Sequence, residues 1–176
     1  MLIKKGIKEL VMELGGFIAL RENVTAHIGN WASERVESTT STGTYDSAFD
    51  KVALQLKERL ISLGIEVRPP ENYCEGDYID EILEEALANS VGRGNMYNAS
   101  LPTYIKLIEC RDGYIVSIRD SGKGFDAYEI ARMREEGCMG SFKNLGDGFT
   151  LFMESHYRIS FTRDGTVFNV AVPKRK

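Results

Sequence analysis

The chain has 176 residues, of which 43% are hydrophobic and 27% are charged, and its formal net charge is −4. This length accommodates one well-buried core, and the balance of apolar and charged residues is that of a folded globular protein. The only basic cluster is the terminal Lys174-Arg175-Lys176. Because nucleic-acid binding needs a concentrated basic face, the composition argues against a nucleic-acid partner.

The cysteines and the apolar runs restrict the class of protein further. Cys74, Cys110 and Cys138 are far apart and include no CxxC pair, so we expect neither a disulfide framework nor a zinc site. The longest apolar run near the N-terminus, residues 10–20, is interrupted by Glu13 and two glycines. It is shorter than the roughly 20 residues that span a bilayer. We therefore expect no membrane insertion and a cytoplasmic location.

The first third of the chain predicts two helices. Apolar residues at helical spacing indicate an amphipathic helix over 2–14, which Gly15-Gly16 ends. The pattern from 17 to about 37 is ambiguous. A second helix begins after Asp46 or Ser47 and ends at Gly64, because one apolar stripe runs between these positions.

The middle of the chain predicts a helix followed by a hairpin. Residues 77–91 have the most regular helical spacing in the sequence, with apolar side chains at i, i+3, i+4 and i+7. Two extended runs, 104–111 and 114–120, follow it. Asp112-Gly113 between them is a strong signal for a type I′ turn.

The last third repeats that order. Asp126 is placed to cap a small helix over 126–137, and a short helix should start near Gly148. A hairpin of 157–162 and 166–172 follows, with Asp164-Gly165 as its turn. Helices alternating with hairpins predict an α+β fold: a two-layer sandwich of a mixed, mainly antiparallel sheet with helices on one face.

Glu85 and Asn89 are the first candidate site. They lie one helical turn apart, at the edge of the apolar stripe of the 77–91 helix. An amide oxygen suits Mg²⁺, and a carboxylate beside it can orient or deprotonate a nucleophile. A solvated Glu and Asn pair is the alternative, because such pairs are common on helices.

The second candidate site is Asp120 with the glycines that follow it. Asp120 closes the row of alternate residues that contains Val116 and Ile118, so its carboxylate should lie buried where the strand ends. A buried carboxylate needs hydrogen bonds, and the exocyclic amine of adenine would donate one. Gly122 and Gly124 would permit close approach of a ligand. The alternative is a glycine-rich turn in which neighbouring amides satisfy Asp120.

Two further segments are weaker signals when taken alone. Gly146 and Gly148, followed by Phe149, stand at the mouth of a short helix, where free backbone N–H groups can bind phosphate. They form neither a Walker A loop nor a GxGxxG fingerprint. Thr166, next to the last turn, is an ordinary strand residue unless a ligand binds beside it.

In this order and spacing, the four segments resemble the GHKL superfamily of ATP-binding domains, which includes histidine kinases, type II topoisomerases, a class of heat-shock chaperones and the MutL repair proteins. EALAN followed by Arg93-Gly94 is similar to the N box, and DSGKGF to the DxGxG box. GDGFTL is similar to the second glycine box, and DGT to the closing Gly-Thr pair. The resemblance covers about residues 31–176 and leaves 1–30 as an N-terminal helical extension.

Within the superfamily, the compact layout and the GxGFTLxxE sequence are most similar to bacterial anti-sigma-factor serine kinases. The resemblance implies the Bergerat, or histidine-kinase-like, ATPase fold, with ATP and Mg²⁺ as cofactors. It implies Glu85 as the catalytic residue, Asn89 as the Mg²⁺ ligand and a lid over 126–145. It implies that the nucleotide contacts are Asn89, Arg93, Asp120, Gly122, Gly124, Gly146, Gly148, Phe149 and Thr166.

Three functions follow as hypotheses. The first is a serine kinase that phosphorylates an anti-sigma antagonist and binds a sigma factor. The second is the catalytic part of a two-component histidine kinase, for which His27 is the weak phosphoacceptor candidate. The third is a nucleotide-gated interaction module without phosphoryl transfer. A homodimer contact through the N-terminal helix is an alternative to its packing on its own domain.

Overall fold

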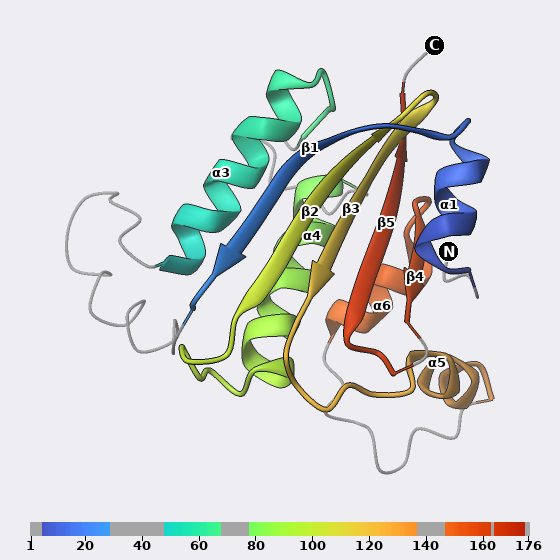
Figure 1. Cartoon of the computed structure of the whole chain (residues 1–176). Coiled ribbons are helices and arrows are strands. Elements are labelled where there is room, and N and C mark those ends of the chain that lie inside the picture. Colours follow the sequence, from blue (N-terminus) through green and yellow to red (C-terminus); the bar gives the residue numbers. More distant parts are fainter. Residues whose placement is uncertain (1–4, 29–47, 68–77, 137–146, 163, 175–176) are drawn as a thin grey trace.

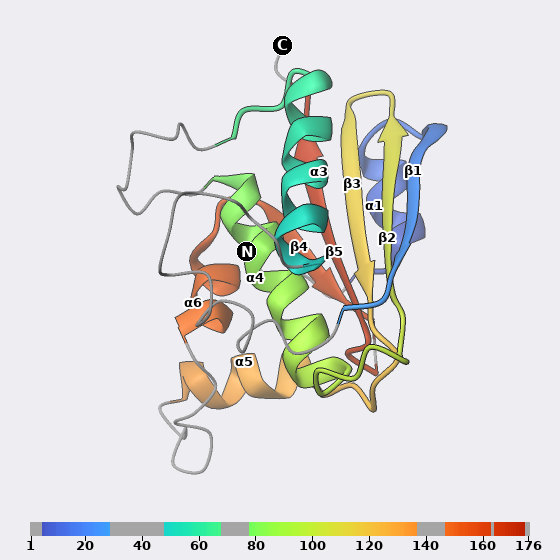
Figure 2. The same cartoon turned by 90° about the vertical axis from the view of Figure 1, so that its left-hand side faces the viewer.

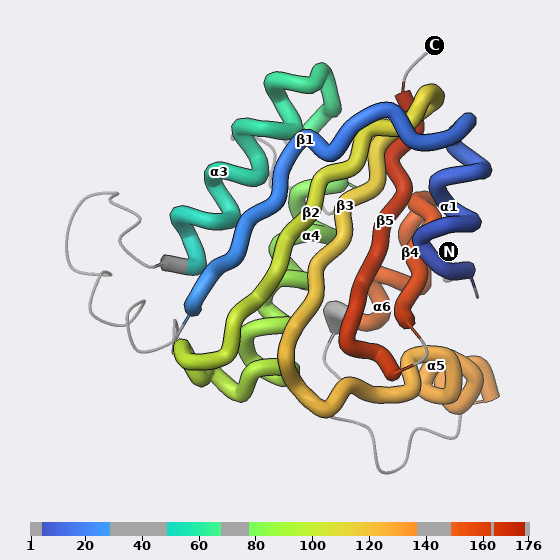
Figure 3. The backbone as a smooth tube through the Cα atoms, in the orientation of Figure 1, coloured from blue at the N-terminus to red at the C-terminus, as the bar shows by residue number. Residues whose placement is uncertain are grey.

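The structure is a computed structural model that describes residues 5–28, 48–67, 78–136, 147–162 and 164–174. Its elements follow one another along the chain as shown in Figure 1, and Figure 3 traces the same path as a backbone tube. In chain order they are α1 (Ile7–Glu13), β1 (Phe17–Ala26), α3 (Ala48–Ser62), α4 (Ile79–Asn89), the π-helical turn η1 (Ser90–Gly94), β2 (Thr103–Cys110), β3 (Gly113–Arg119), α5 (Ala127–Glu135), α6 (Asp147–Glu154), β4 (Arg158–Phe161) and β5 (Val167–Pro173).

The five strands form one sheet in the order β1-β2-β3-β5-β4. Among the residues that the structure describes, every pair of neighbouring strands is antiparallel, so the α+β, mainly antiparallel prediction is confirmed and no parallel pair of the expected mixed sheet is present there. The reason lies in the connections: β2 and β3, and β4 and β5, are joined by short turns. A short turn can join only antiparallel strands, whereas a parallel pair needs a long crossover.

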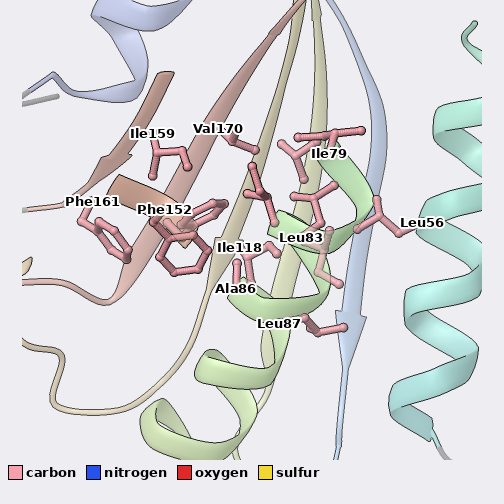
Figure 4. Close-up of a cluster of buried hydrophobic side chains, with 14 of the residues drawn as sticks. Leu56, Ile79, Leu83, Ala86, Leu87, Ile118, Phe152, Ile159, Phe161 and Val170 are labelled. Carbon is pink, nitrogen blue, oxygen red and sulfur yellow. The ribbon is translucent and has the colours of Figure 1, made fainter. Parts of the chain in front are cut away.

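The main core lies between one face of the sheet and helices α3, α4, α5 and α6. The edge-on view of Figure 2 shows α3, α4 and α6 on the same side of the sheet. Alternate residues of each strand point toward them, and Figure 4 shows part of this cluster. Ile79, Leu83 and Ile118 are at most 2% exposed, and burying each such side chain contributes about 1.5–3 kcal/mol. The apolar stripe predicted for residues 77–91 is therefore the buried face of α4.

Helix α1 packs on the opposite face of the sheet, which the sequence prediction left bare (Figure 2). Leu10 of α1 and Leu14, its C-cap residue, form a small second cluster with Ile108 of β2 and Ile115 of β3. Successive residues of a strand point to opposite faces of the sheet. Because these strands have apolar residues at both odd and even positions, both faces of the sheet must be buried. The prediction of helices on one face only is corrected accordingly, and the prediction that α1 packs on its own chain is confirmed.

Residues 17–26, where the sequence pattern is ambiguous, form the edge strand β1. It pairs with β2 from Phe17 opposite Cys110 to Ala26 opposite Thr103, with two bulges. Within the expected N-terminal extension over 1–30, α1 is helical and β1 belongs to the sheet. The bulges shift the alternation of apolar and polar residues, and this explains why the period of a strand is hard to read there.

The β2–β3 hairpin is confirmed, but the predicted turn is wrong by one residue. Cys110 pairs with Gly113, so Arg111 and Asp112 form the loop, and neither has a positive φ. Gly113 is instead the first residue of β3. A Cβ there would lie 2.5 Å from the carbonyl oxygen of Val172, so close packing, and not turn geometry, requires the glycine.

Candidate functional site

A cavity of about 830 Å³ lies where α4, η1 and the loop after β3 meet α5, α6 and the β4–β5 hairpin. A volume of this size is within the range of small-molecule sites. Of the predicted site residues, the structure brings together Glu85, Asn89, Arg93, Asp120, Gly122, Gly124 and Phe149 around it. The first candidate site, on α4, and the second candidate site, after β3, thus line the same cavity.

Glu85 and Asn89 contact each other on the cavity side of α4. The Asn89 Nδ2 donates a hydrogen bond of 2.7 Å to the Glu85 Oε1. This bond holds the amide with its nitrogen toward Glu85, so the Asn89 oxygen is not used in the pair. Directly after Asn89 the helix widens into η1, and a π-helical turn of this kind is often found at functional sites. The turn carries Arg93, which is exposed and lines the cavity.

Asp120 lies at the end of β3 as predicted, and it is 8% exposed. Its Oδ1 accepts a hydrogen bond of 2.9 Å from the Gly122 N–H, and its own N–H donates to the Thr166 carbonyl. Burial raises the pKa of the Asp120 carboxyl above its usual range, while the bond from Gly122 acts in the opposite direction. A carboxylate held in this way has a strong tendency to accept a further hydrogen bond from a ligand.

The glycines around Asp120 pack the loops against one another. A Cβ on Gly94 would lie 2.4 Å from the Asp120 Cγ, and a Cβ on Gly122 would lie 2.1 Å from the Gly94 oxygen. A Cβ on Gly124 would lie 1.7 Å from the Asp164 oxygen. The sequence interpretation, that Gly122 and Gly124 leave room for a ligand, is therefore incomplete: both line the cavity, but the space beside them is filled by neighbouring backbone.

One part of the cavity wall is aromatic. Phe125 packs edge-to-face on Phe149 and on Phe161, with ring centroids 6.4 and 5.4 Å apart. Phe152 and Phe168 continue this group, with their centroids 5.1 Å apart. All five rings line the cavity, so a flat apolar ring system is the ligand part that this region suits.

The remaining predicted nucleotide contacts and the predicted lid have different outcomes in the structure. Gly146 lies outside the described residues, and Gly148 lies in the first turn of α6. Thr166 is not among the described residues that line the cavity. Its hydroxyl donates 3.0 Å to the Asp164 Oδ1, which also accepts from Thr162. Of the lid predicted over 126–145, the structure describes the part that forms α5, which Asp126 caps as expected.

Asn95 and Lys123 are two polar residues among those of the cavity that sequence reasoning missed. Lys123 is exposed at the cavity and is part of the DSGKGF segment, but no spacing rule singled it out. Asn95 is 1% exposed and links three segments of chain. A polar residue placed directly after a glycine in a helical pattern gives no signal of burial, so only the fold reveals its position.

Met96 and Tyr97 form a strained turn beside the cavity, with φ of 52° and 55°. A side chain in this left-handed region costs about 1–3 kcal/mol unless its surroundings hold it there. The Tyr97 N–H donates to the Val91 oxygen at 2.9 Å, which fixes the turn against η1. Strained backbone that is held by surrounding contacts is typical of binding sites.

We expect Met96→Gly to raise the free energy of unfolding by about 0.5–1 kcal/mol, because glycine adopts a positive φ without strain. Met96 is 80% exposed, so little packing is lost. Met12→Gly is the matched control, since Met12 is 74% exposed but helical, and it should lower the free energy of unfolding by about 1 kcal/mol. Urea unfolding measures both variants. An equal loss of the free energy of unfolding in the two would contradict a strained backbone at Met96.

The histidine proposed as a phosphoacceptor, His27, is exposed just after β1. Its Nδ1 lies 3.0 Å from the Ala99 oxygen, in the turn that precedes β2. Within the part of the chain that the structure describes, no three His, Cys, Asp or Glu side chains are grouped as metal ligands. Among the same residues, no helix has the length and hydropathy of a membrane span.

Comparison with known proteins gives no family assignment. No protein-family model matches the chain, and no curated protein matches it.

Proposed function

We propose that this chain binds ATP with Mg²⁺ in the cavity and transfers the γ-phosphoryl group to a serine of a partner protein. The observation that carries the proposal is the buried Asp120 carboxylate, which opens on the same cavity as the Glu85–Asn89 pair. The four motifs that resemble the GHKL boxes support the same function from the sequence. They also imply the partner class, an anti-sigma antagonist or a sigma factor.

The cavity suits a purine nucleotide in its size and in its lining. Its volume of about 830 Å³ is ample for a drug-sized ligand, and its aromatic wall can contact a planar base. Asp120 supplies the acceptor that the exocyclic amine of adenine requires. Guanine has a carbonyl in the place of that amine, and two acceptors repel, so Asp120 should select adenine.

The polar residues suit the triphosphate and its metal ion. Asn89 offers an amide oxygen, a ligand type that Mg²⁺ accepts together with phosphate oxygens and waters. Arg93 and Lys123 place positive charge at the mouth of the cavity. Mg²⁺ would neutralise charge on the phosphates when bound, and this chain's own contribution is to orient the nucleotide.

Glu85 is the candidate base for the transfer. The serine hydroxyl oxygen forms a bond to the γ-phosphorus, the bond between that phosphorus and the β–γ bridging oxygen breaks, and ADP leaves. The proton of the hydroxyl passes to the Glu85 carboxylate. The bond from Asn89 fixes the position of this carboxylate next to the metal ligand.

Calorimetric titration tests nucleotide binding directly. We expect the full chain to bind ATP in the presence of Mg²⁺ and to bind GTP at least tenfold more weakly, because the 6-carbonyl of guanine cannot donate to Asp120 as the 6-amino group of adenine can. Absence of heat with ATP at millimolar concentration, from protein shown to be folded by circular dichroism, would overturn the proposal.

Glu85→Gln tests the catalytic part. We expect phosphoryl transfer from labelled ATP to a serine-containing antagonist domain to fall by about 10²–10⁴-fold, since the base is lost, while the Kd for ATP changes less than threefold. Glu84→Gln is the matched control, because Glu84 is exposed on the same helix and does not line this cavity. Equal rates of phosphoryl transfer in both variants would show that Glu85 is not the catalytic base.

A nucleotide-gated interaction module is the second candidate, and the 2.7 Å bond between Asn89 and Glu85 favours it. An Asn and a Glu that bond to each other on one helix can act as a structural pair that stabilises the helix, without a part in catalysis. In that case ATP would still bind, and partner binding would depend on Asp120 but not on Glu85. The titration and the Glu85→Gln assay together separate the two functions.

A further inference from the structure

The loop that carries Asp120 is held in place by one buried side chain, Asn95. The Asn95 Oδ1 accepts a hydrogen bond of 2.8 Å from the Ser121 N–H, directly next to Asp120. The Asn95 Nδ2 donates to the Leu101 oxygen and to the Thr103 Oγ1, each at 3.0 Å. Three segments of chain, η1, the turn before β2 and the loop after β3, therefore meet on one amide.

Only an amide satisfies this position. Asn95 is 1% exposed, so each of its polar atoms needs a partner inside the protein. The site requires one acceptor and two donors in a plane, which is what a carboxamide provides. A carboxylate lacks the donors, and an apolar side chain would leave the Ser121 N–H without its partner, at a cost of about 1–3 kcal/mol.

The contacts next to Asn95 extend its effect to the carboxylate. Gly94, the preceding residue, lies so close to Asp120 that a Cβ would be 2.6 Å from its Oδ2. Ser121 is held a second time, because its hydroxyl donates 2.9 Å to the Pro102 oxygen. The backbone of Asn95 is fixed too, since its N–H donates 2.8 Å to the Ser90 oxygen of η1. Asn95 thus sets the distance between η1 and the loop after β3.

We infer that Asn95 is a positioning residue, which orients the Asp120 carboxylate in the cavity and so determines the preference for a 6-aminopurine. The inference rests on the proposed function for the nature of the ligand. Its structural half, control of the Asp120 environment by Asn95, does not depend on any ligand.

The variant Asn95→Ala removes the bond to Ser121, and Thr103→Val serves as the matched control. Thr103 is fully buried, and valine has nearly the same shape as threonine, so this change removes one bond of the same network but keeps the bond that the Ser121 N–H donates to Asn95. If Asn95→Ala does not fold, Asn95→Ser replaces it, because a serine hydroxyl is too short to reach the Ser121 N–H.

The first measurement is the carboxyl titration of Asp120 by ¹³C NMR in nucleotide-free protein. We expect the pKa of Asp120 to be raised in the wild type and in Thr103→Val, and to return toward its ordinary value in the Asn95 variant, whose loop admits water. An unchanged titration in the Asn95 variant overturns the inference, whether or not the protein binds ATP.

The second measurement is the ratio of the Kd for purine riboside triphosphate, which lacks the 6-amino group, to the Kd for ATP. We expect a ratio of about 10 or more in the wild type and in Thr103→Val, and a ratio near 1 in the Asn95 variant. Lower affinity for both nucleotides with an unchanged ratio indicates a purely structural role and contradicts the inference. If the wild type binds neither nucleotide, the proposed function fails, and the NMR titration alone decides the role of Asn95.

Discussion

The substitution Asp120→Asn is expected to weaken ATP binding by about 10- to 150-fold and to stabilise the nucleotide-free protein. The loss of affinity follows because a charge-assisted hydrogen bond from the adenine amine contributes about 1.5–3 kcal/mol. The gain in stability follows because the carboxylate is 8% exposed and its charge is costly to bury. We expect the free energy of unfolding to rise by about 0.5–2 kcal/mol, the size of a typical stabilising substitution.

The pH dependence of stability has a definite sign. Burial raises the pKa of Asp120 in the folded protein, whereas the unfolded chain has the ordinary value of about 3.9. The stabilising contribution is therefore complete below the unfolded pKa and is lost as the pH rises through the folded pKa. Asp120→Asn should stabilise the protein at neutral pH and should have little effect at pH 3. Urea unfolding at the two pH values measures this difference.

Asp164→Asn is the matched control, because it makes the same chemical change with the opposite expected sign. Hydrogen bonds, first from Thr162 and then from Thr166, lower the pKa of Asp164. Its contribution is thus present above the unfolded pKa and lost as the pH falls through the folded pKa. Asp164→Asn should destabilise the protein at neutral pH. If both variants shift stability in the same direction, burial does not govern Asp120.

The elements that sequence reasoning predicted well are those with local signals. The caps and glycines of the chain mark helix ends without reference to the rest of the fold: Asp126 caps α5, and Gly64, with a φ of +72°, follows α3. The row that ends at Asp120 was predictable as well, because strand periodicity assigns alternate residues to the same face. The contact between Glu85 and Asn89 follows from helical spacing alone.

The features that sequence reasoning missed depend on distant contacts. Strand β1 forms by pairing with β2, and its bulges obscure the alternation of apolar and polar residues. The role of Asn95 requires the loop after β3 to lie against η1, which no local pattern encodes. Gly113 was assigned to the turn because the Asp-Gly dipeptide is a strong turn signal, but the packing of β5 against β3 decides its position. Tertiary contacts thus override local preferences at the edge of the sheet and in the β2–β3 hairpin as well as at the cavity.

The substitution Gly124→Ala is expected to be the most destabilising change of a single methyl group in the site, at more than about 4 kcal/mol. Gly124 has a φ of +69°, and an added Cβ would lie 1.7 Å from the Asp164 oxygen and 2.9 Å from the Thr166 Cγ2. These atoms belong to the β4–β5 turn, so the turn and the loop after β3 would have to separate. The nucleotide site should open with them, and ATP affinity should fall.

Gly64→Ala isolates the contribution of the backbone conformation. Gly64 has nearly the same φ, +72°, but an added Cβ would meet no atom within 4 Å among the described residues. This variant should lose only the conformational term of about 1–2 kcal/mol and should keep its ATP affinity. Urea unfolding and calorimetric titration of both variants measure the two effects.

Gly122→Ala supplies the case of steric contact without a positive φ, since its Cβ would lie 2.1 Å from the Gly94 oxygen. If Gly124→Ala costs no more than Gly64→Ala, the loops around Asp120 are not packed as tightly as these distances require, and the carboxylate is not held by them.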